Sequence, residues 1–212
     1  MSESTVLRYN LTERVIHWLA ALSYLYVLVT GLAFWTPKLW WMAEMLGGGP
    51  VARAWHPWAG LLFVGTLLWM FKEWRGDMRT TEADLKWRAK MRDYIENRDE
   101  HLPGVGRFNF GQKQFFWIMF YAGLTLLTSG LVLWFSDSLP WTWRALRYLS
   151  VLAHAIGFLF TAAAFIVHVY MGTAVVRGGF TSIIRGEVSR TWAETHHALW
   201  LDETSANTKR EK

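Results

Sequence analysis

Four long apolar segments constrain this chain more than any other feature of its sequence. A helix needs about 20 mostly apolar residues to cross the hydrocarbon core of a bilayer. Four stretches approach or exceed that length, near residues 15–36, 55–72, 114–135 and 148–176. The second is the shortest, but it has no charged side chain between His56 and Lys72. We therefore expect an all-α integral membrane protein in which residues 1–212 form a single four-helix membrane domain.

Composition supports a membrane protein and excludes several other classes. Charged residues make up 18% of the chain and hydrophobic residues 52%, whereas about 25% charge is usual in soluble domains. The chain has no cysteine, which excludes disulfides, iron–sulfur clusters and covalently attached haem on this chain. The net charge of +5 comes without a basic stripe between exposed aromatics, so nucleic acid is not an expected partner. The first apolar stretch is followed by no small-residue cleavage site, so we expect it to be retained.

The positions of lysine and arginine orient the helices, because positive charge is concentrated on the cytoplasmic side of membrane proteins. Ten of these residues lie from Lys72 to Lys113, six in the tail 177–212 and two before residue 15. The other two loops together hold four. We therefore expect a multi-pass protein of the bacterial inner membrane, with both termini and the loop 73–113 in the cytoplasm.

Four of the seven histidines lie in or at the ends of the apolar stretches. Ionisable side chains in such places are rare and usually mark a functional site. The orientation gives each one a depth: His17 and His168 lie near the cytoplasmic face, and His56 and His154 near the outer face. Each depth therefore receives one histidine from each of two helices, which predicts two ligand pairs. The other three histidines, in charged or polar segments, are expected to be solvated: His101, His196 and His197.

The spacing of His154 and His168 indicates the cofactor. Fourteen residues turn about 1400°, roughly 40° short of four full turns, so both side chains share one helix face. Their separation along the helix is roughly 21 Å, which is too large for one metal ion and suits two stacked macrocycles. Bis-histidine ligation leaves no open position for oxygen chemistry, so the role is electron transfer. The sequence thus predicts a di-haem cytochrome b bundle with two haem b groups.

Small and basic residues near these histidines are candidate haem contacts. Gly31 lies fourteen residues after His17 and so on its ligand face, and four other glycines could also make room for a porphyrin: Gly60, Gly123, Gly130 and Gly157. Arg14 and Arg53 each precede a predicted ligand by three residues and could pair with haem propionates. Close helix packing for the glycines, and anchoring at the membrane edge for the arginines, are the alternatives.

The cytoplasmic segments are predicted to contain two amphipathic helices that lie on the membrane or on a partner subunit. The loop helix follows the cap sequence Thr81-Glu-Ala-Asp84, and its apolar positions are Leu85, Trp87, Met91, Tyr94 and Ile95. The tail helix is predicted from Phe180, Ile183, Ile184, Val188 and Trp192.

A short polar stretch just before the third apolar segment is a candidate quinone site near the His168 haem. Asn109 and Gln112 could donate hydrogen bonds to a quinone carbonyl, and Gly111 permits a tight turn between them. Helix capping and turn formation explain these residues equally well.

These motifs resemble the gamma, or cytochrome b, subunit of membrane-bound respiratory formate dehydrogenases over almost the whole chain. The matching stretches are Glu13-Arg-Val-Ile-His17-Trp, His56-Pro57, Asn109-Phe-Gly-Gln-Lys113, His154-Ala, His168-Val-Tyr-Met-Gly172 and the tail Gly186-Glu-Val-Ser-Arg-Thr-Trp192-Ala-Glu-Thr-His-His197. The tail is the most family-specific of them. Pro57 is expected near a helix start, where its missing amide costs little.

The resemblance implies the direction of electron flow and the partners. Electrons would arrive from an iron–sulfur beta subunit on the outer side and pass the His56/His154 haem, then the His17/His168 haem, then menaquinone or ubiquinone. Asn109, Gly111, Gln112, His168 and Gly172 match positions near the quinone. No catalytic residue for formate oxidation lies on this chain, so that reaction belongs to a molybdenum- or tungsten-containing alpha subunit. The family also implies a possible trimer of heterotrimers.

Two other functions stay open from the residues alone. The chain could be the cytochrome b subunit of another respiratory dehydrogenase, such as a hydrogenase or thiosulfate reductase, although the tail favours formate dehydrogenase. A haem-free scaffold or transporter is the third hypothesis. Four helices are few for a transporter, and the sequence has no inverted repeat with interrupted helices.

Overall fold

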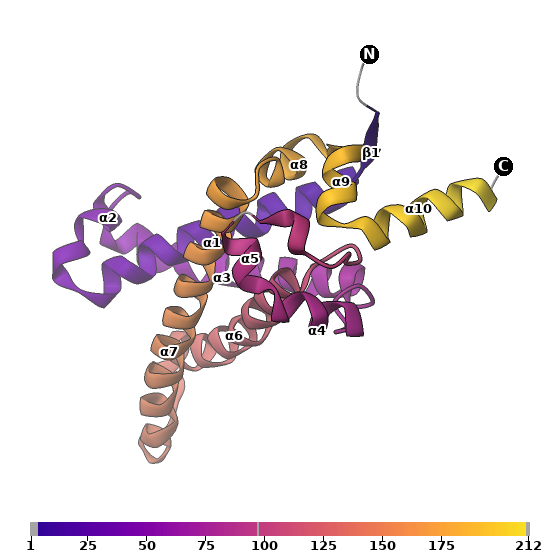
Figure 1. Cartoon of the computed structure of the whole chain (residues 1–212). Coiled ribbons are helices and arrows are strands. Elements are labelled where there is room, and N and C mark those ends of the chain that lie inside the picture. The colour runs from indigo at the N-terminus through magenta and orange to yellow at the C-terminus, as the bar shows by residue number, and fades with distance from the viewer. Residues whose placement is uncertain (1–3, 97, 211–212) are drawn as a thin grey trace. The chain divides into compact units, whose positions relative to one another are not determined.

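The computed structural model describes residues 4–96 and 98–210, and the chain is mostly helical (Figure 1). The four apolar stretches form α1 (Leu11–Trp35), α3 (Gly49–Trp74), α6 (Phe110–Trp134) and α7 (Arg144–Tyr170). The shorter helices are α2 (Trp41–Glu44), α4 (Glu82–Ala89), α5 (Met91–Ile95), α8 (Gly179–Arg185), α9 (Arg190–His196) and α10 (Ala198–Arg210). The remaining elements are β1 (Thr5–Leu7), β2 (Glu187–Ser189), the 3-10 helices η1 (Pro37–Leu39), η2 (Asp99–His101), η3 (Ser136–Ser138) and η4 (Trp141–Trp143), and the π-helix η5 (Met171–Val175). The predicted predominance of helix is confirmed.

Two long helices begin at the same kind of polar cap. The Glu13 amide donates to Asn10 Oδ1 and the Asn10 amide donates to Glu13 Oε2, both at 2.9 Å. Asn109 and Gln112 repeat this reciprocal pair at the start of α6, at 2.9 and 3.0 Å. Each box satisfies two amides that the helix itself leaves without partners. The caps explain why both helices begin before the predicted apolar stretch.

The start of α3 differs from the prediction. The helix begins at Gly49 rather than near residue 55, so Pro57 lies inside it and not at its start. Proline has no amide hydrogen to donate to the carbonyl four residues earlier, at Arg53. The prediction used the run of apolar residues, which begins near residue 55. The first turns of the helix are more polar, so the apolar run did not include them.

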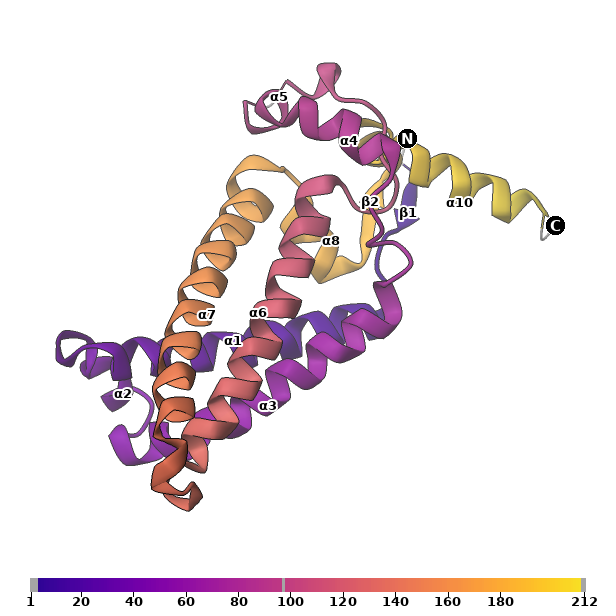
Figure 2. The same cartoon turned by 90° about the horizontal axis from the view of Figure 1, so that it is seen from below.

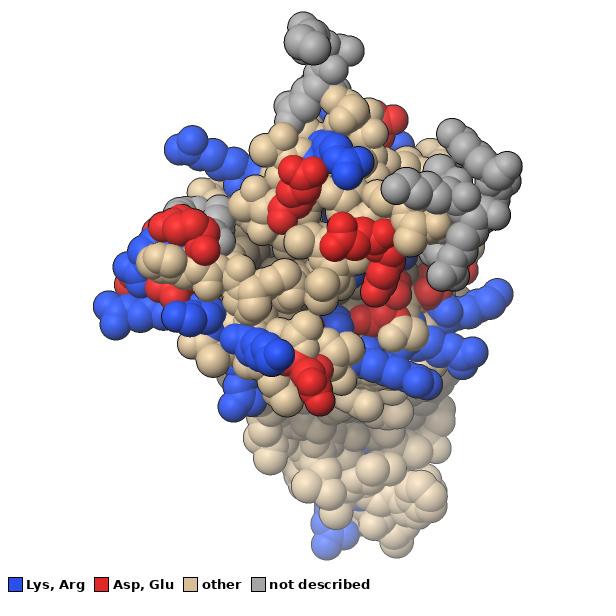
Figure 3. Space-filling model, turned by 45° about the vertical axis from the view of Figure 1, so that its right-hand side comes forward, with Lys and Arg blue, Asp and Glu red and all other residues tan. Residues whose placement is uncertain are grey.

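Length and apolar composition qualify three helical stretches to cross a membrane: Leu11–Trp35, Phe110–Trp134 and Trp141–Val175. The α7 stretch exposes Phe160 and Ile166 by 62% and 68%, as expected for side chains that face lipid. Figure 3 shows charged side chains gathered over one part of the visible surface, while another part is almost free of them. These features support an integral membrane protein. Membrane crossing by α3, which is 26 residues long, stays a prediction.

The chain divides into two compact units. Unit 1 contains Met1–Arg14, Glu73–Trp117 and Ile166–Lys212, and unit 2 contains Val15–Lys72 and Ile118–Phe165. Unit 2 therefore holds the greater part of the four long helices. Unit 1 holds one end of each long helix together with the short elements. The single domain expected over 1–212 stays a prediction.

Within unit 1, the two ends of the chain meet in a small antiparallel sheet. Val6 of β1 lies opposite Val188 of β2 (Figure 2), and Val188 packs in a core with Ala193, Trp200 and Leu201. Gly186 ends α8 with a φ of +87°, and a Cβ there would lie 2.7 Å from the Tyr9 carbonyl oxygen. The single tail helix predicted from Phe180 to Trp192 is therefore wrong, because the chain breaks at this glycine to form β2 before α9.

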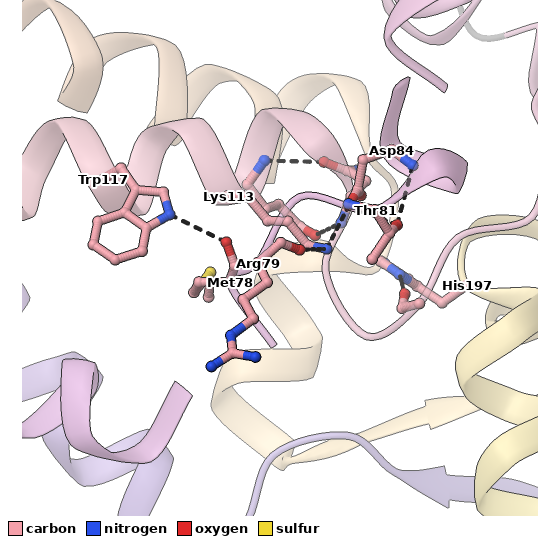
Figure 4. Close-up of polar contacts among 10 residues, drawn as sticks. Met78, Arg79, Thr81, Asp84, Lys113, Trp117 and His197 are labelled. Atoms are coloured by element: carbon pink, nitrogen blue, oxygen red, sulfur yellow. Dashed lines mark hydrogen bonds and ion pairs between the residues drawn. The ribbon is translucent and has the colours of Figure 1, made fainter. Parts of the chain in front are cut away.

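The loop helix is confirmed, in two pieces. Thr81 and Asp84 form the expected capping box at the start of α4. Trp87 and Tyr94 pack with their ring centroids 4.8 Å apart, whereas three of the predicted apolar positions are exposed: Leu85, Met91 and Ile95. Lys113 Nζ donates to Asp84 Oδ2 at 2.7 Å and to the Arg79 carbonyl at 2.9 Å (Figure 4), which joins the loop to the first turn of α6.

A buried carboxylate joins three segments of unit 1. Glu13 Oε1 accepts a hydrogen bond from Trp74 Nε1 at 2.7 Å and one from Arg107 Nη2 at 2.6 Å. The Glu13 side chain is 6% exposed and that of Arg107 is 23% exposed. One oxygen atom, Glu13 Oε1, therefore connects the start of α1 to the end of α3 and to the residues before α6.

Replacement of this carboxylate should destabilise the fold. We expect Glu13→Ala to lower the free energy of unfolding by about 3 kcal/mol, because it removes the buried carboxylate from Trp74 and from the Arg107 guanidinium, which keeps its longer ion pair with Asp77. Thermal unfolding in detergent measures the loss. The control Glu194→Ala breaks the exposed pair with Arg190 and should have little effect. Equal losses in the two variants would contradict the prediction.

Candidate cofactor site

The two histidines predicted near the outer face lie together in unit 2. His56 on α3 and His154 on α7 have ring centroids 6.3 Å apart. An imidazole nitrogen lies roughly 1.1 Å from its ring centre and binds a metal at about 2.0 Å. Two imidazoles on opposite sides of one ion therefore have centres about 6 Å apart, so this pair could hold a single metal centre.

Each ring is held by a hydroxyl group from a neighbouring helix. Thr30 Oγ1 lies 2.6 Å from His56 Nδ1, and Ser129 Oγ lies 3.0 Å from His154 Nδ1. Thr30 is fully buried and Ser129 is 5% exposed. The sequence analysis missed both residues. The available signal was a hydroxyl residue followed by glycine, which the chain contains twice, as Thr30-Gly31 and Ser129-Gly130.

The candidate glycines separate into two kinds. A Cβ at Gly130 would lie 3.1 Å from His154 Cε1, and one at Gly31 would lie 3.5 Å from the Phe158 ring and 4.0 Å from His56 Cε1. At Gly123 and Gly157 the nearest atoms belong instead to Leu67 and Leu126 side chains, which is close helix packing. A Cβ at Gly60 would meet nothing within 4 Å. Gly31 and Gly130 thus provide room beside the two rings, which fits a bulky group at this depth.

The two histidines predicted near the inner face belong to different units. In unit 2, His17 lies edge-on to Trp18, with centroids 5.6 Å apart. In unit 1, the His168 ring stacks on Phe115 of α6, with centroids 4.1 Å apart and an interplanar angle of 6°. The pairing of His17 with His168 stays a prediction.

The helix that carries His168 changes its winding directly after it. The Val176 amide donates to the Met171 carbonyl at 2.9 Å, five residues back, so η5 is a π-type turn. Such turns often occur at functional sites. Gly172 lies in this turn, and a Cβ there would meet no atom within 4 Å, so the backbone is open on this side.

The candidate quinone residues have a structural role at the start of α6. The side-chain oxygens of Asn109 and Gln112 accept the two capping hydrogen bonds, which leaves the amide NH2 groups as their side-chain donors to a quinone carbonyl. Gly111 lies within the first turn of α6, so the tight turn expected there is wrong: the cap at Asn109 starts the helix earlier.

The two propionate candidates differ in their surroundings. The Arg14 guanidinium donates to the carbonyls of Ile183 and Ile184 in α8, which favours an anchoring role. Arg53 is exposed in the second turn of α3. The propionate contact stays a prediction for both.

His197 is buried, which corrects its expected solvated position. It is 2% exposed, with Nδ1 2.8 Å from the Gly106 carbonyl oxygen and Nε2 3.1 Å from Arg8 Nη2. A carbonyl only accepts, so Nδ1 donates to it and Nε2 accepts from Arg8. The Arg8 guanidinium also lies 4.7 Å from the ring centre of Trp200. Tail polarity gave no sign of this, because the partner is distant in sequence.

The environment of this pair opposes protonation. Burial, and then the Arg8 charge, hold the pKa of His197 well below its usual value of 6.5. Burial likewise lowers the pKa of Arg8. The folded chain therefore contains a neutral His197 that accepts from a charged arginine.

The sequence of this chain is similar to those of known cytochromes. A family model described as prokaryotic cytochrome b561 matches residues 8–186. The chain is 29% identical over 208 residues to the formate dehydrogenase, cytochrome b556(fdo) subunit of Escherichia coli (strain K12), covering 97% of this chain and 96% of that one. It is 29% identical over 207 residues to the nitrate-inducible cytochrome b556(Fdn) subunit of the same organism, with 96% and 94% covered. The cytochrome b556 subunit of Haemophilus influenzae is 28% identical over 207 residues, with 95% and 84% covered. The resemblance inferred from the motifs is confirmed.

Acidification should destabilise the fold through His197. In the unfolded chain this histidine takes up a proton near pH 6.5, whereas in the folded chain it resists protonation. The unfolded state therefore binds more protons, and stability falls as the pH drops through about 6.5. We expect the unfolding midpoint of His197→Asn to fall less between pH 8 and pH 5.5 than that of the unchanged chain. Parallel curves would contradict the prediction.

Proposed function

Because the chain belongs to the prokaryotic cytochrome b561 family, we propose that it is the membrane-anchoring di-haem subunit of a formate:quinone oxidoreductase. It accepts electrons from an iron–sulfur beta subunit on the periplasmic side and delivers them to menaquinone or ubiquinone near the cytoplasmic face. Formate is oxidised on a molybdenum- or tungsten-containing alpha subunit. The similarity to formate dehydrogenase cytochrome b556 subunits over 97% of this chain supports the same role for the whole chain.

The observation that carries the proposal is the pair His56 and His154. Their 6.3 Å centroid separation suits one iron between them, and Gly31 and Gly130 leave space beside the rings. The family implies haem b, which His56 and His154 would hold and which would supply reversible one-electron chemistry. Arg53, one turn from His56, is the propionate candidate with an exposed guanidinium.

The second haem is proposed between His17 and His168. The support is the 14-residue spacing of His154 and His168 on α7, which puts them on one face of a continuous helix. Stacking on Phe115 fixes the plane of the His168 ring. A ligand whose plane is fixed loses less freedom when it binds metal.

A hydrogen bond that joins two helix ends supports four membrane crossings. Glu13 Oε1 at the start of α1 accepts from Trp74 Nε1 at the end of α3, at 2.7 Å. A chain that leaves one face of the bilayer through α1 would therefore return to that face before Trp74. Helix α3 is 26 residues long, or about 39 Å, which exceeds the roughly 30 Å hydrocarbon core. This supports α3 as the fourth span, although its hydropathy is lower.

The same logic supports the proposed orientation. The N-terminal segment, the residues from Glu73 to Trp117 and the tail all belong to unit 1, which supports a shared side of the membrane for them. Most of the Lys and Arg residues lie in these segments, and positive charge favours the cytoplasmic side. The partner subunits that supply electrons would then contact the opposite side.

Quinone reduction is proposed beside His168, at the start of α6. The Asn109 and Gln112 NH2 groups are the proposed hydrogen-bond donors. A Cβ at Gly172 in η5, just after His168, would meet no atom within 4 Å, so the backbone there is open to a ligand. Protons for the reduced quinone would come from the cytoplasm.

Haem loss on histidine substitution tests the proposed pairs. We expect His56→Ala and His154→Ala each to lower the content from two haems to one per chain, measured as the pyridine haemochrome of the purified complex. Both variants should keep the same remaining haem, identified by its reduction potential. The control His101→Ala removes an exposed ring and should keep both haems. Two haems in either ligand variant would overturn the outer pair.

The electron donor is tested in the same preparation. Formate should reduce both haems of the purified complex, whereas hydrogen should not. Reduction by hydrogen and not by formate would instead favour the cytochrome b subunit of a hydrogenase.

Variants that preserve the helix cap isolate the quinone contact. Asn109→Asp and Gln112→Glu keep the oxygens that accept the capping hydrogen bonds but remove the NH2 donors. We expect at least tenfold slower quinone reduction with unchanged haem content and formate-reduced haem spectra. Asn10→Asp, the equivalent change in the α1 cap, is the matched control. Unchanged quinone kinetics in both α6 variants would exclude this site.

A further inference from the structure

The two outer histidines share an arrangement that extends beyond ligation. Each Nδ1 atom lies within hydrogen-bond distance of one buried hydroxyl group, Thr30 for His56 and Ser129 for His154. Each hydroxyl residue precedes a glycine that leaves room for the same ring: Gly31 for His56 and Gly130 for His154. The hydroxyls come from α1 and α6, so each ring is held by a helix other than its own.

The direction of these hydrogen bonds follows from counting protons. A hydroxyl has one proton to donate. Thr30 Oγ1 lies 2.8 Å from the Tyr26 carbonyl oxygen, and Ser129 Oγ lies 2.6 Å from the Thr125 carbonyl oxygen. A carbonyl only accepts, so each hydroxyl donates to its own helix, one turn earlier. Each hydroxyl oxygen must then accept from the histidine, and Nδ1 carries the imidazole proton.

We propose that Thr30 and Ser129 are positioning residues that hold His56 and His154 in the Nδ1–H tautomer and aim both Nε2 atoms at one haem iron. This inference rests on the proposed function. The second partner of a metal-bound histidine fixes its tautomer and ring orientation, and it raises the basicity of the ligating nitrogen. A more basic ligand pair stabilises ferric iron, so the hydroxyls lower the reduction potential of the outer haem.

The test removes one hydroxyl at a time and follows the potential and the ferric electron paramagnetic resonance (EPR) spectrum of each haem. Thr30→Val keeps the side-chain shape and removes the acceptor, and Thr30→Ser restores it. Ser129→Ala and Ser129→Thr form the second pair. Ser23→Ala on α1 and Thr128→Val on α6 are matched controls, because those hydroxyls also donate to carbonyls of their own helices.

The expected result is a higher potential and a broadened EPR signal for the outer haem in both Thr30→Val and Ser129→Ala. The Ser and Thr rescue variants should return to the original values, and the inner haem should not change. Loss of the outer haem alone in Thr30→Val, with recovery in Thr30→Ser, would also support the proposal. If Thr30→Val lost both haems, the potential measured in Ser129→Ala would decide.

An unchanged outer potential and EPR spectrum in both Thr30→Val and Ser129→Ala would overturn the positioning role, as would an equal shift in Ser23→Ala. The histidine variants separate this failure from that of the proposed function. If His56→Ala loses one haem while Thr30→Val is unaltered, the haem site stands and only the role of the hydroxyls is wrong. If His56→Ala keeps both haems, the outer haem site and the positioning role both fail.

Discussion

Polar groups inside a lipid-facing helix have no water to bond, and the structure depends on how this chain satisfies them internally. Backbone groups are satisfied by long α-helices, because a helix pairs them within one segment. Hydroxyl groups follow the same rule: Ser23, Thr30 and Ser129 each donate to a carbonyl one turn earlier. A hydroxyl that has used its proton in this way is left as an acceptor. It can therefore hold the N–H of a buried imidazole without leaving a donor unpaired.

In unit 1, buried charged side chains form ion pairs. Glu13, Arg107, Asp84 and Lys113 are held in two ion pairs that connect the ends of the long helices. A buried charge without a partner would be costly, so these contacts specify which segments meet. The Lys113–Asp84 pair joins α4 to the first turn of α6, which also carries the Asn109 cap. The Glu13–Trp74 bond holds the start of α1 next to the end of α3.

Sequence patterns predicted the long helices, and they predicted that His56 and His154 lie at one depth, where the structure has their rings near each other. They succeeded because helical periodicity and charge asymmetry are properties of short segments. They were wrong for the start of α3, the tail helix and His197, where the deciding contacts come from distant residues. The Gly186 turn, for example, depends on a close approach to Tyr9. His197 is buried because Arg8, nearly the whole chain away in sequence, lies against it.

By itself, the sequence determined a helical membrane protein, because hydrophobic length needs no tertiary information. The two depths of its histidines stay a prediction from the count of positive charges. It left each glycine and each cap residue with two explanations. Only the tertiary structure separated the glycines that face His56 and His154 from those that pack helices, since that depends on which side chain lies opposite. Only the structure identified Thr30 and Ser129, because a hydroxyl in an apolar helix has no sequence mark that tells which ring it holds. The reason is the same in each case. Hydrophobicity is a property of a continuous segment, whereas a side chain's contacts come from residues that are distant in sequence.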